Sequence, residues 1–344
     1  MHQIKSIKIM VSKKKYELTS ETIEFNGVTL YRIRAIKNFG NVKSGNLGGW
    51  IEKEDNLSQS GDAWIGGDAK VCDNAKAFGN AQIYGNVQIY GNAQICGKAQ
   101  VYGNAQVCGN TSVYGTALIY GDTKVCGNAQ VYGDAHIFGN AIIYDNAEVY
   151  GNAQVYDNAR VFGNAMVYGN AFVYGDAWVY NYAEVYCNAH IYGNAMVGGN
   201  SRAYGYACIY DKAEVYGNAE VYGDAQVYGN AEVHGNAQVY GYARIYDNAE
   251  IYGKSMVYGD AQVYGRARIS GDASVRCGAD YIIFKNFWSS GRFFTWTRSN
   301  NMWSVGCFYG TGEELIRKAY KDSAKSSKEY EKIVRYVDSI LADK

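Results

Sequence analysis

The 344-residue chain lacks proline altogether and contains only four histidines, and its 33 basic residues are balanced by 33 acidic ones. This composition excludes collagen-like, proline-rich and strongly charged disordered chains. No run approaches the roughly 18 apolar residues of a membrane-spanning helix, and residues 1–15 lack the apolar core of a signal peptide. We therefore expect a soluble, cytoplasmic protein with no membrane partner.

The eight cysteines form no CxxC pair, so neither a zinc site nor a disulfide framework is predicted. They fall singly or on repeat positions, and we expect reduced thiols. Cys108 and Cys126 are 18 residues apart and would form an oxidation-prone pair only in a compartment that allows it.

Glycine and tyrosine are abundant, with 41 Gly and 34 Tyr against 11 Phe. An aliphatic residue returns every six positions from Ile65 to Val275, which makes 36 hexads without an insertion, and only Ala77 and Ala203 depart from it. A typical unit reads aliphatic, Tyr, Gly, Asn or Asp, Ala, variable. Because strand side chains alternate between two faces, the Ala and aliphatic residues point inward, and Gly-Asn forms a corner that tolerates positive φ.

One such short strand and corner cannot bury its apolar side alone, so successive units must coil and stack. Three hexads close one coil of 18 residues, which predicts an all-β solenoid of about 12 coils. This pattern resembles the hexapeptide-repeat left-handed parallel β-helix family, best known from acyltransferases. The resemblance implies a single-stranded parallel β-helix, and the left-handed coiling rests on it alone.

A second resemblance covers the segments that flank the repeats. Residues 45–58 (GNLGGWIEKEDNLS) and 287–315 (FWSSGRFFTWTRSNNMWSVGCFYGTGEEL) look like the flanks of Tyr-Gly-Asn-Ala repeats in uncharacterised phage and prophage proteins. That resemblance implies a phage or prophage context and, with it, the cytoplasm of a bacterial host cell. It implies no reaction.

The flanks predict caps for the open ends of the coil, which would otherwise expose backbone edges. Asn26-Gly27 between apolar residues predicts a β-hairpin turn. Thr311 with Glu314, and Ser326 with Glu329, are typical capping boxes for helices near 312–321 and 327–342. The expected regions are a small β-rich N-terminal cap over 1–58, the β-helix over 59–277, and an α+β C-terminal cap over 278–344, with strands near 281–287, 292–297 and 302–308 preceding two helices.

The repeat offers no catalytic residue, metal site or cofactor-binding motif. Acyltransferases that resemble this pattern use a histidine beside loops that interrupt the coils, whereas here His136, His190 and His234 point outward along an uninterrupted repeat. His190 and Cys208 lie on neighbouring coils without a third ligand beside them, so no metal is expected.

The outward positions carry the functional information. Of the 36 positions that follow the aliphatic residue, 24 are tyrosine. Such ladders either stabilise the coil alone or form a binding surface, and both interpretations stay open. One face departs from the pattern, with Gly198 expected to leave a notch beside aromatic residues. Its candidate binding residues are Ile142, Tyr144, Phe162, Trp178, Tyr180, Met196, Gly198, Glu214, Glu232 and Glu250.

The leading hypothesis is a non-enzymatic, phage- or prophage-encoded binding protein. Its partner would be a host protein, and the binding could inhibit a host or defence enzyme. A second copy of the chain, in a dimer or trimer, is an alternative partner. Nucleic acid is not expected, because residues 59–277 carry a net charge of −7. Two alternatives remain open: an acyltransferase-like enzyme with an inter-subunit site, and a structural, filament or virion component.

Overall fold

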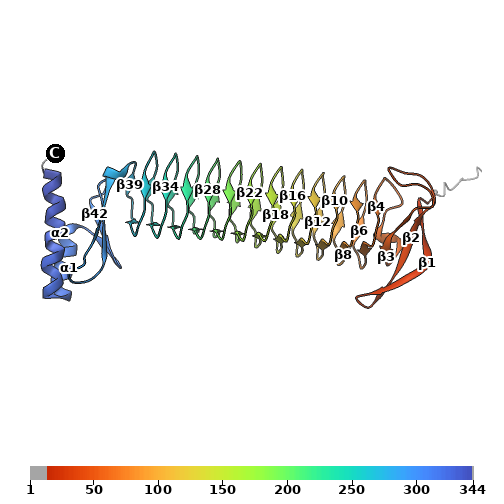
Figure 1. The fold of residues 1–344 in the computed structure, drawn as a ribbon, viewed down its shortest axis with the longest axis horizontal. Helices are drawn as coiled ribbons and strands as arrows, with labels where there is room; N and C mark the ends of the chain where they lie inside the picture. The colour runs from red at the N-terminus through yellow and green to blue at the C-terminus, as the bar shows by residue number, and fades with distance from the viewer. Residues whose placement is uncertain (1–13, 343–344) are drawn as a thin grey trace, which may run out of the picture. The chain divides into compact units, whose positions relative to one another are not determined.

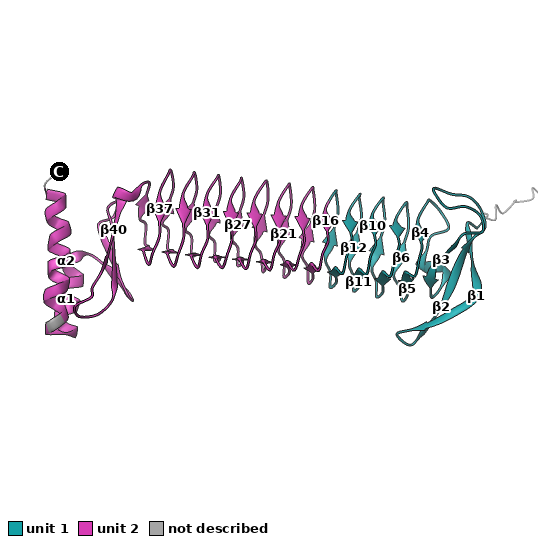
Figure 2. Cartoon of the chain, viewed as in Figure 1, with its two compact units in different colours: residues 1–134 teal, residues 135–344 magenta. Residues whose placement is uncertain are grey.

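The chain folds into two compact units, Met1–Asp134 and Ala135–Lys344, which Figure 2 colours separately. A computed structural model describes residues 14–342. Both units are built from the predicted parallel β-solenoid, and Figure 1 shows its successive coils. Each hexad forms a strand of two residues, from β4 (Trp64–Ile65) to β39 (Ser274–Val275), and each strand starts six residues after the one before it.

Unit 1 begins with the predicted hairpin. Strands β1 (Tyr16–Phe25) and β2 (Val28–Ala35) pair antiparallel, and Asn26 and Gly27 take φ values of 50° and 80°, as a two-residue turn of this kind requires. Strand β3 (Leu47–Ile51) pairs antiparallel with β2 and parallel with β5 (Lys70–Val71), so it joins the hairpin to the coils. A short 3-10 helix, η1 (Glu54–Asn56), follows β3.

The first coil of unit 1 is closed by Lys15, whose residue surface is 1% exposed. Its ammonium group donates hydrogen bonds to the carbonyl oxygens of Gly61 and Ala63 at 3.1 and 2.8 Å. Burial lowers the pKa of Lys15 to about 8. The ammonium thus pairs carbonyl groups at the N-terminal end of the coils, where the sheet ends at β4.

Unit 2 contains the 24 strands from β16 (His136–Ile137) to β39, which make eight coils; unit 1 has four coils, from β4 to β15 (Gln130–Val131). The total is the twelve coils that the sequence predicts. In unit 2, every third strand pairs in register to form three parallel columns, which start at β16, β17 (Ile142–Ile143) and β18 (Glu148–Val149). The left hand of the coil stays an expectation from the resemblance.

The interior of each coil is filled by the alanine and aliphatic side chains, as predicted. Ala153, Val155, Val161 and Val167 all have 0% exposed surface. Burying one valine side chain stabilises the fold by roughly 1.5–3 kcal/mol, so the stabilisation grows with every coil added.

The corners are stabilised by backbone conformation and by polar side chains. Gly169 takes φ of +69°, and a Cβ there would lie 2.9 Å from the backbone nitrogen of Cys187 in the next coil. At some corners aspartate stands in place of glycine, and its carboxylate forms a hydrogen bond that offsets the cost of a positive φ. Asp157, at φ 56°, accepts a hydrogen bond from the N–H of Gly175 at 3.2 Å. Only Gly, and at a cost Asn or Asp, adopts this conformation readily.

The C-terminal cap of unit 2 follows a short 3-10 helix, η2 (Gly278–Asp280). It contains an antiparallel sheet of four strands and two helices. These elements are β40 (Tyr281–Lys285), β41 (Phe293–Thr297), β42 (Met302–Val305), β43 (Phe308–Gly310), α1 (Gly312–Asp322) and α2 (Ala324–Ala342). Among residues 14–342, no helix is long and apolar enough to cross a membrane.

One of the two predicted helix starts is confirmed. Thr311 Oγ1 accepts a hydrogen bond from Glu314 N at 3.3 Å, and Glu314 Oε2 accepts one from Thr311 N at 2.8 Å. The start predicted at Ser326 is wrong, because α2 begins two residues earlier and Ser326 N donates to Ser323 Oγ at 3.3 Å. Both serines offer the same hydroxyl, but Ser323 is the single residue between α1 and α2, so it lies at the N-terminus of α2 and accepts the hydrogen bond there.

Candidate binding surface

All ten predicted binding residues lie on one column of unit 2, the column that starts at β17. Its strands place Ile142, Arg160, Trp178 and Met196 in direct register on consecutive coils. The glutamates continue this register from Met196 onward. Six of the ten residues, which precede the glutamates along this column, are called the aromatic patch: Ile142, Tyr144, Phe162, Trp178, Tyr180 and Met196.

Trp178 is the most exposed member of the aromatic patch, with 37% of its surface accessible. Its ring contacts Phe162 edge to face, with centroids 6.0 Å apart and planes at 74°. The guanidinium carbon of Arg160 lies 5.2 Å from the Trp178 ring centroid. These two contacts fix the orientation of a large exposed ring, which lowers the entropy lost when a partner binds it.

The notch predicted at Gly198 is filled. Gly198 is buried, and a Cβ at this position would lie 2.3 Å from Cζ of Tyr180. The Tyr180 ring therefore covers the place that a tyrosine at 198 would occupy. Its centroid lies 5.5 Å from that of Phe162, whereas Phe162 and Tyr144 are 4.8 Å apart. Burial, and secondarily Glu214, raises the pKa of Tyr180.

Three stacked glutamates, Glu214, Glu232 and Glu250, form the acidic ladder. Glu232 accepts a hydrogen bond from the Tyr216 hydroxyl at 3.0 Å, and Glu250 forms an ion pair with Arg268 at 2.7 Å. Within residues 14–342, Glu214 has no hydrogen bond or ion pair from its side chain. Glu214, the glutamate nearest the aromatic patch, is therefore the one whose charge is not paired with a donor or a cation. Like charges one coil apart repel, so its charge is also opposed by Glu232.

Sequence reasoning missed a shallow depression beside Trp178. Corner residues supply part of its wall: Asn158 donates a hydrogen bond to Asp176 Oδ1 at 3.1 Å. The 18-residue spacing of these polar corners is the signal that could have identified it. The depression is lined by Asn158, Arg160, Asp176, Trp178, Asn194 and Met196.

The other two columns carry regular tyrosine ladders. Tyr156, Tyr174, Tyr192 and Tyr210 stack with centroids 4.9–5.0 Å apart and planes within 3° of parallel. Each ring in such a ladder contacts the rings above and below it. This geometry supports the interpretation that regular ladders stabilise the coil, and it leaves the aromatic patch as the place where the stacking pattern changes.

Two of the three outward histidines, His190 and His234, are stacked with aromatic neighbours. His190 lies 4.7 Å from the ring centroid of Phe172, and His234 lies between Tyr216 and Tyr252 at 4.8 and 5.2 Å. Burial lowers the pKa of both imidazoles. No group of three His, Cys, Asp or Glu side chains able to hold a metal ion occurs among the described residues.

The cysteines on these columns differ in ionisation. Burial raises the pKa of Cys208, the neighbour of His190, which disfavours its thiolate. In unit 1, a hydrogen bond from Cys126, assisted by Tyr90 and Lys124, lowers the pKa of Cys108 to about 6 against the cost of burial. The lowered pKa favours the Cys108 thiolate, and only 9% of the residue surface is exposed.

Comparisons with known proteins bear on the repeat. A comparison with curated proteins gave no match. A family model, the YdcK β-solenoid repeat, matches four segments, at residues 81–97, 153–169, 225–241 and 261–276. These segments start 72, 72 and 36 residues apart, all multiples of eighteen, so each match begins at the same point of the coil. In these segments the chain is similar to β-solenoid repeat proteins, which supports a repeat β-helix family.

Proposed function

We propose that this chain is a non-enzymatic binding protein that engages another protein through the aromatic patch and the acidic ladder. The observation that supports this most directly is Trp178, a ring that is 37% exposed yet held in place by Phe162 and Arg160. Fixed, exposed tryptophans beside charged residues are typical of interaction hot spots.

The surface also favours a particular partner chemistry. An apolar pocket on the partner would receive the edge of Trp178, and Met196 would line the contact. A basic group would pair with Glu214, which has no side-chain partner among the described residues. Opposite charges of this kind accelerate association and set its salt dependence more than they add affinity.

The context of the partner rests on the resemblance of the flanking segments to phage and prophage proteins. That context favours a bacterial host protein, and an enzyme or a defence system is the target class we propose. The proposed site of action is the host cytoplasm. Self-association of this chain through the same surface is the competing form of binding.

Affinity capture from bacterial lysate, followed by a titration with the purified captured protein, tests the proposal. We expect Trp178→Ala to weaken binding about 30-fold, which corresponds to roughly 2 kcal/mol, and to leave the melting temperature unchanged. Tyr242→Ala is the matched control, because Tyr242 is a corner tyrosine with 66% exposed surface outside the column. Glu214→Lys should slow association and reverse its salt dependence.

Two results would overturn this function. A lowered melting temperature with unchanged affinity in Trp178→Ala would mean that the ring only packs on Phe162. Turnover of acetyl-CoA that is lost on changing His136, His190 or His234 would favour an acyltransferase. Sedimentation analysis of Trp178→Ala distinguishes a foreign partner from a second copy of the chain.

A further inference from the structure

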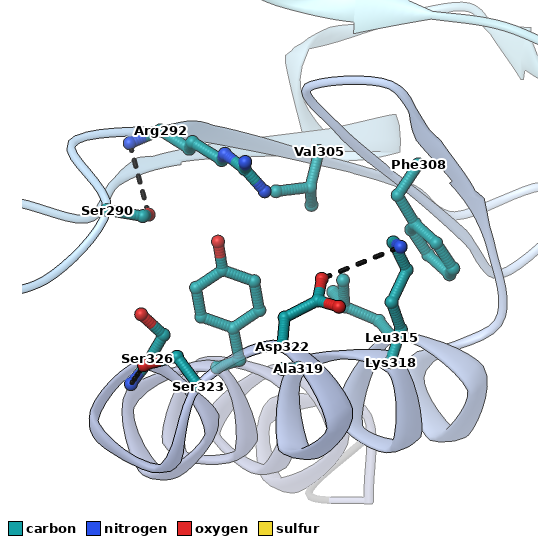
Figure 3. A pocket seen from close by; sticks show the side chains of 11 residues that line it. Ser290, Arg292, Val305, Phe308, Leu315, Lys318, Ala319, Asp322, Ser323 and Ser326 are labelled. Carbon is teal, nitrogen blue, oxygen red and sulfur yellow. Dashed lines mark hydrogen bonds and ion pairs between the residues drawn. The ribbon is translucent and has the colours of Figure 1, made fainter.

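The C-terminal cap has a cavity of about 240 Å³ between its sheet and its two helices, which is partly open to solvent (Figure 3). A cavity of about 150 Å³ is sufficient to hold benzene, so this one has room for a small organic molecule. It does not overlap the aromatic patch or the acidic ladder. The residues that line it are Ser290, Arg292, Val305, Phe308, Leu315, Lys318, Ala319, Asp322, Ser323, Ser326 and Tyr330.

Part of the cavity lining is polar and carries a cation. In Figure 3, Arg292 and Ser290 lie on the strand side, and Ser323 and Ser326 lie on the helix side. Within residues 14–342, the Arg292 guanidinium forms no ion pair or hydrogen bond. Its planar fork of N–H groups is therefore available to a ligand, and it matches the geometry of a carboxylate.

Tyr330 supplies an independent indication of a ligand. Its residue surface is 5% exposed, and its ring is fixed by an edge-to-face contact with Phe294 at 4.6 Å. Its hydroxyl has no hydrogen-bond partner among the described residues, although the side chain lines the cavity. The hydroxyl is not one of the fully buried polar atoms, so it reaches the solvent space of the cavity, where it can donate a hydrogen bond to a polar ligand atom.

Other parts of the cavity lining are apolar. Val305 and Leu315 are each 1% exposed, Ala319 is 3% exposed, and Phe308 also lines the cavity. Lys318 and Asp322 form an ion pair at 3.5 Å with both side chains about half exposed, so the pair lies at the rim. The lining is thus amphipathic: the Arg292 guanidinium extends toward Val305, and the Lys318–Asp322 ion pair lies beside Leu315 and Phe308 (Figure 3).

We propose that this cavity binds a small organic anion that has a carboxylate head and a short apolar tail. The head pairs with the Arg292 guanidinium and accepts a hydrogen bond from the Tyr330 hydroxyl. The tail packs against Val305, Leu315 and Phe308. This site is separate from the protein-binding surface, so it stands or falls independently of the proposed function.

Calorimetric titration of the full chain tests this site with four probes: hexanoate, hexanol, acetate and inorganic phosphate. We expect hexanoate to bind more tightly than the other three. Arg292→Gln should weaken hexanoate binding roughly tenfold or more, and Tyr330→Phe several-fold, because each removes one hydrogen-bonding group from the carboxylate. Arg298→Gln is the matched control, since Arg298 is an exposed cap arginine that does not line the cavity.

Each alternative outcome has a distinct meaning. Undetectable hexanoate binding overturns the proposal, as does equal binding of hexanol or of phosphate, or an unchanged affinity in Arg292→Gln. Because Tyr330 is buried, Tyr330→Phe is interpreted only with an unchanged melting temperature; the exposed Arg292→Gln variant gives the decisive result in every case. Ala319→Leu, which fills part of the cavity, should abolish hexanoate binding while it preserves the cap.

Discussion

The repeat region of unit 2 and the C-terminal cap place their aromatic residues in opposite ways. In the coils, small aliphatic side chains such as Val155 are fully buried, and the tyrosine rings stack outside. In the cap, Phe294, Trp296 and Trp303 form the buried core with residues of both helices. A coil has no room for a ring inside, whereas a sheet packed on helices needs large side chains to fill the space between them.

This difference determines where each region can vary. Each coil contacts mainly its two neighbours, so its stability is a sum of similar terms and its outer positions are free to change. The core of the cap is one cluster in which every residue has a particular place. We therefore expect a buried substitution in one coil to destabilise the coils on both sides of it, and a substitution in the cap core to destabilise the cap alone. The following predictions test that contrast.

The largest effect is expected in the coils. Val167→Asp and Val185→Asp each place a charge without a partner at a fully buried position, at a cost of several kcal/mol. Hydrogen exchange should lose protection in the coils on both sides of the substitution. Gln154→Asp, at an outward position, is the control and should have almost no effect. Equal damage at all three positions would contradict the assignment of inward and outward positions.

A smaller and more local effect is expected in the cap. Trp303 is 1% exposed, and Trp303→Ala should cost roughly 3–5 kcal/mol because it leaves a large cavity. Hydrogen exchange should show the loss of protection in 281–342, with the coils around Val239 unchanged. Loss of protection throughout unit 2 would show that the two regions fold as one cooperative unit.

The repeat could be predicted in detail from the sequence because one pattern recurs in 36 hexads. The phase of that pattern places Val167 inside and Trp178 outside, and the structure agrees at both positions. The Asn26-Gly27 hairpin and the Thr311 capping box were also predictable, because neighbouring residues alone determine these features.

Features that depend on packing could not be predicted. Gly198 suggested a notch, but Tyr180 covers the space, and no local pattern shows which way a ring will lean. The ion pair of Arg268 with Glu250 could be inferred from the register, yet the lack of a partner for Glu214 could not. The cap cavity joins side chains from distant segments, including Arg292 and Tyr330, which have no common spacing in the sequence.

Within the coils, an irregular stretch at 181–212 should open more easily than its neighbours. Ala203 occupies an aliphatic position there, between Val185 and Val221 in the stack. The smaller side chain makes fewer contacts, so we expect the opening free energy to be lower by roughly 1–2 kcal/mol, or about tenfold faster exchange. Hydrogen exchange compares this stretch with amides around Val155 and Val239, and equal protection would count against the prediction.

The smallest effect is expected at the start of helix α1. Thr311→Ala removes the hydroxyl that accepts the N–H of Glu314 and should cost the cap about 1 kcal/mol. Thr311→Ser keeps the hydroxyl and should retain nearly all of the stability. The Thr311 N–H lowers the pKa of Glu314, so the contribution of that carboxylate is complete above its ordinary pKa and is lost as pH falls through the lowered value. Chemical denaturation that resolves a separate cap transition measures both variants. If Thr311→Ala shifts the cap transition and leaves that of the coils unchanged, the two regions unfold independently even for a minor perturbation. An equal shift of both transitions would mean that the cap and the coils unfold together.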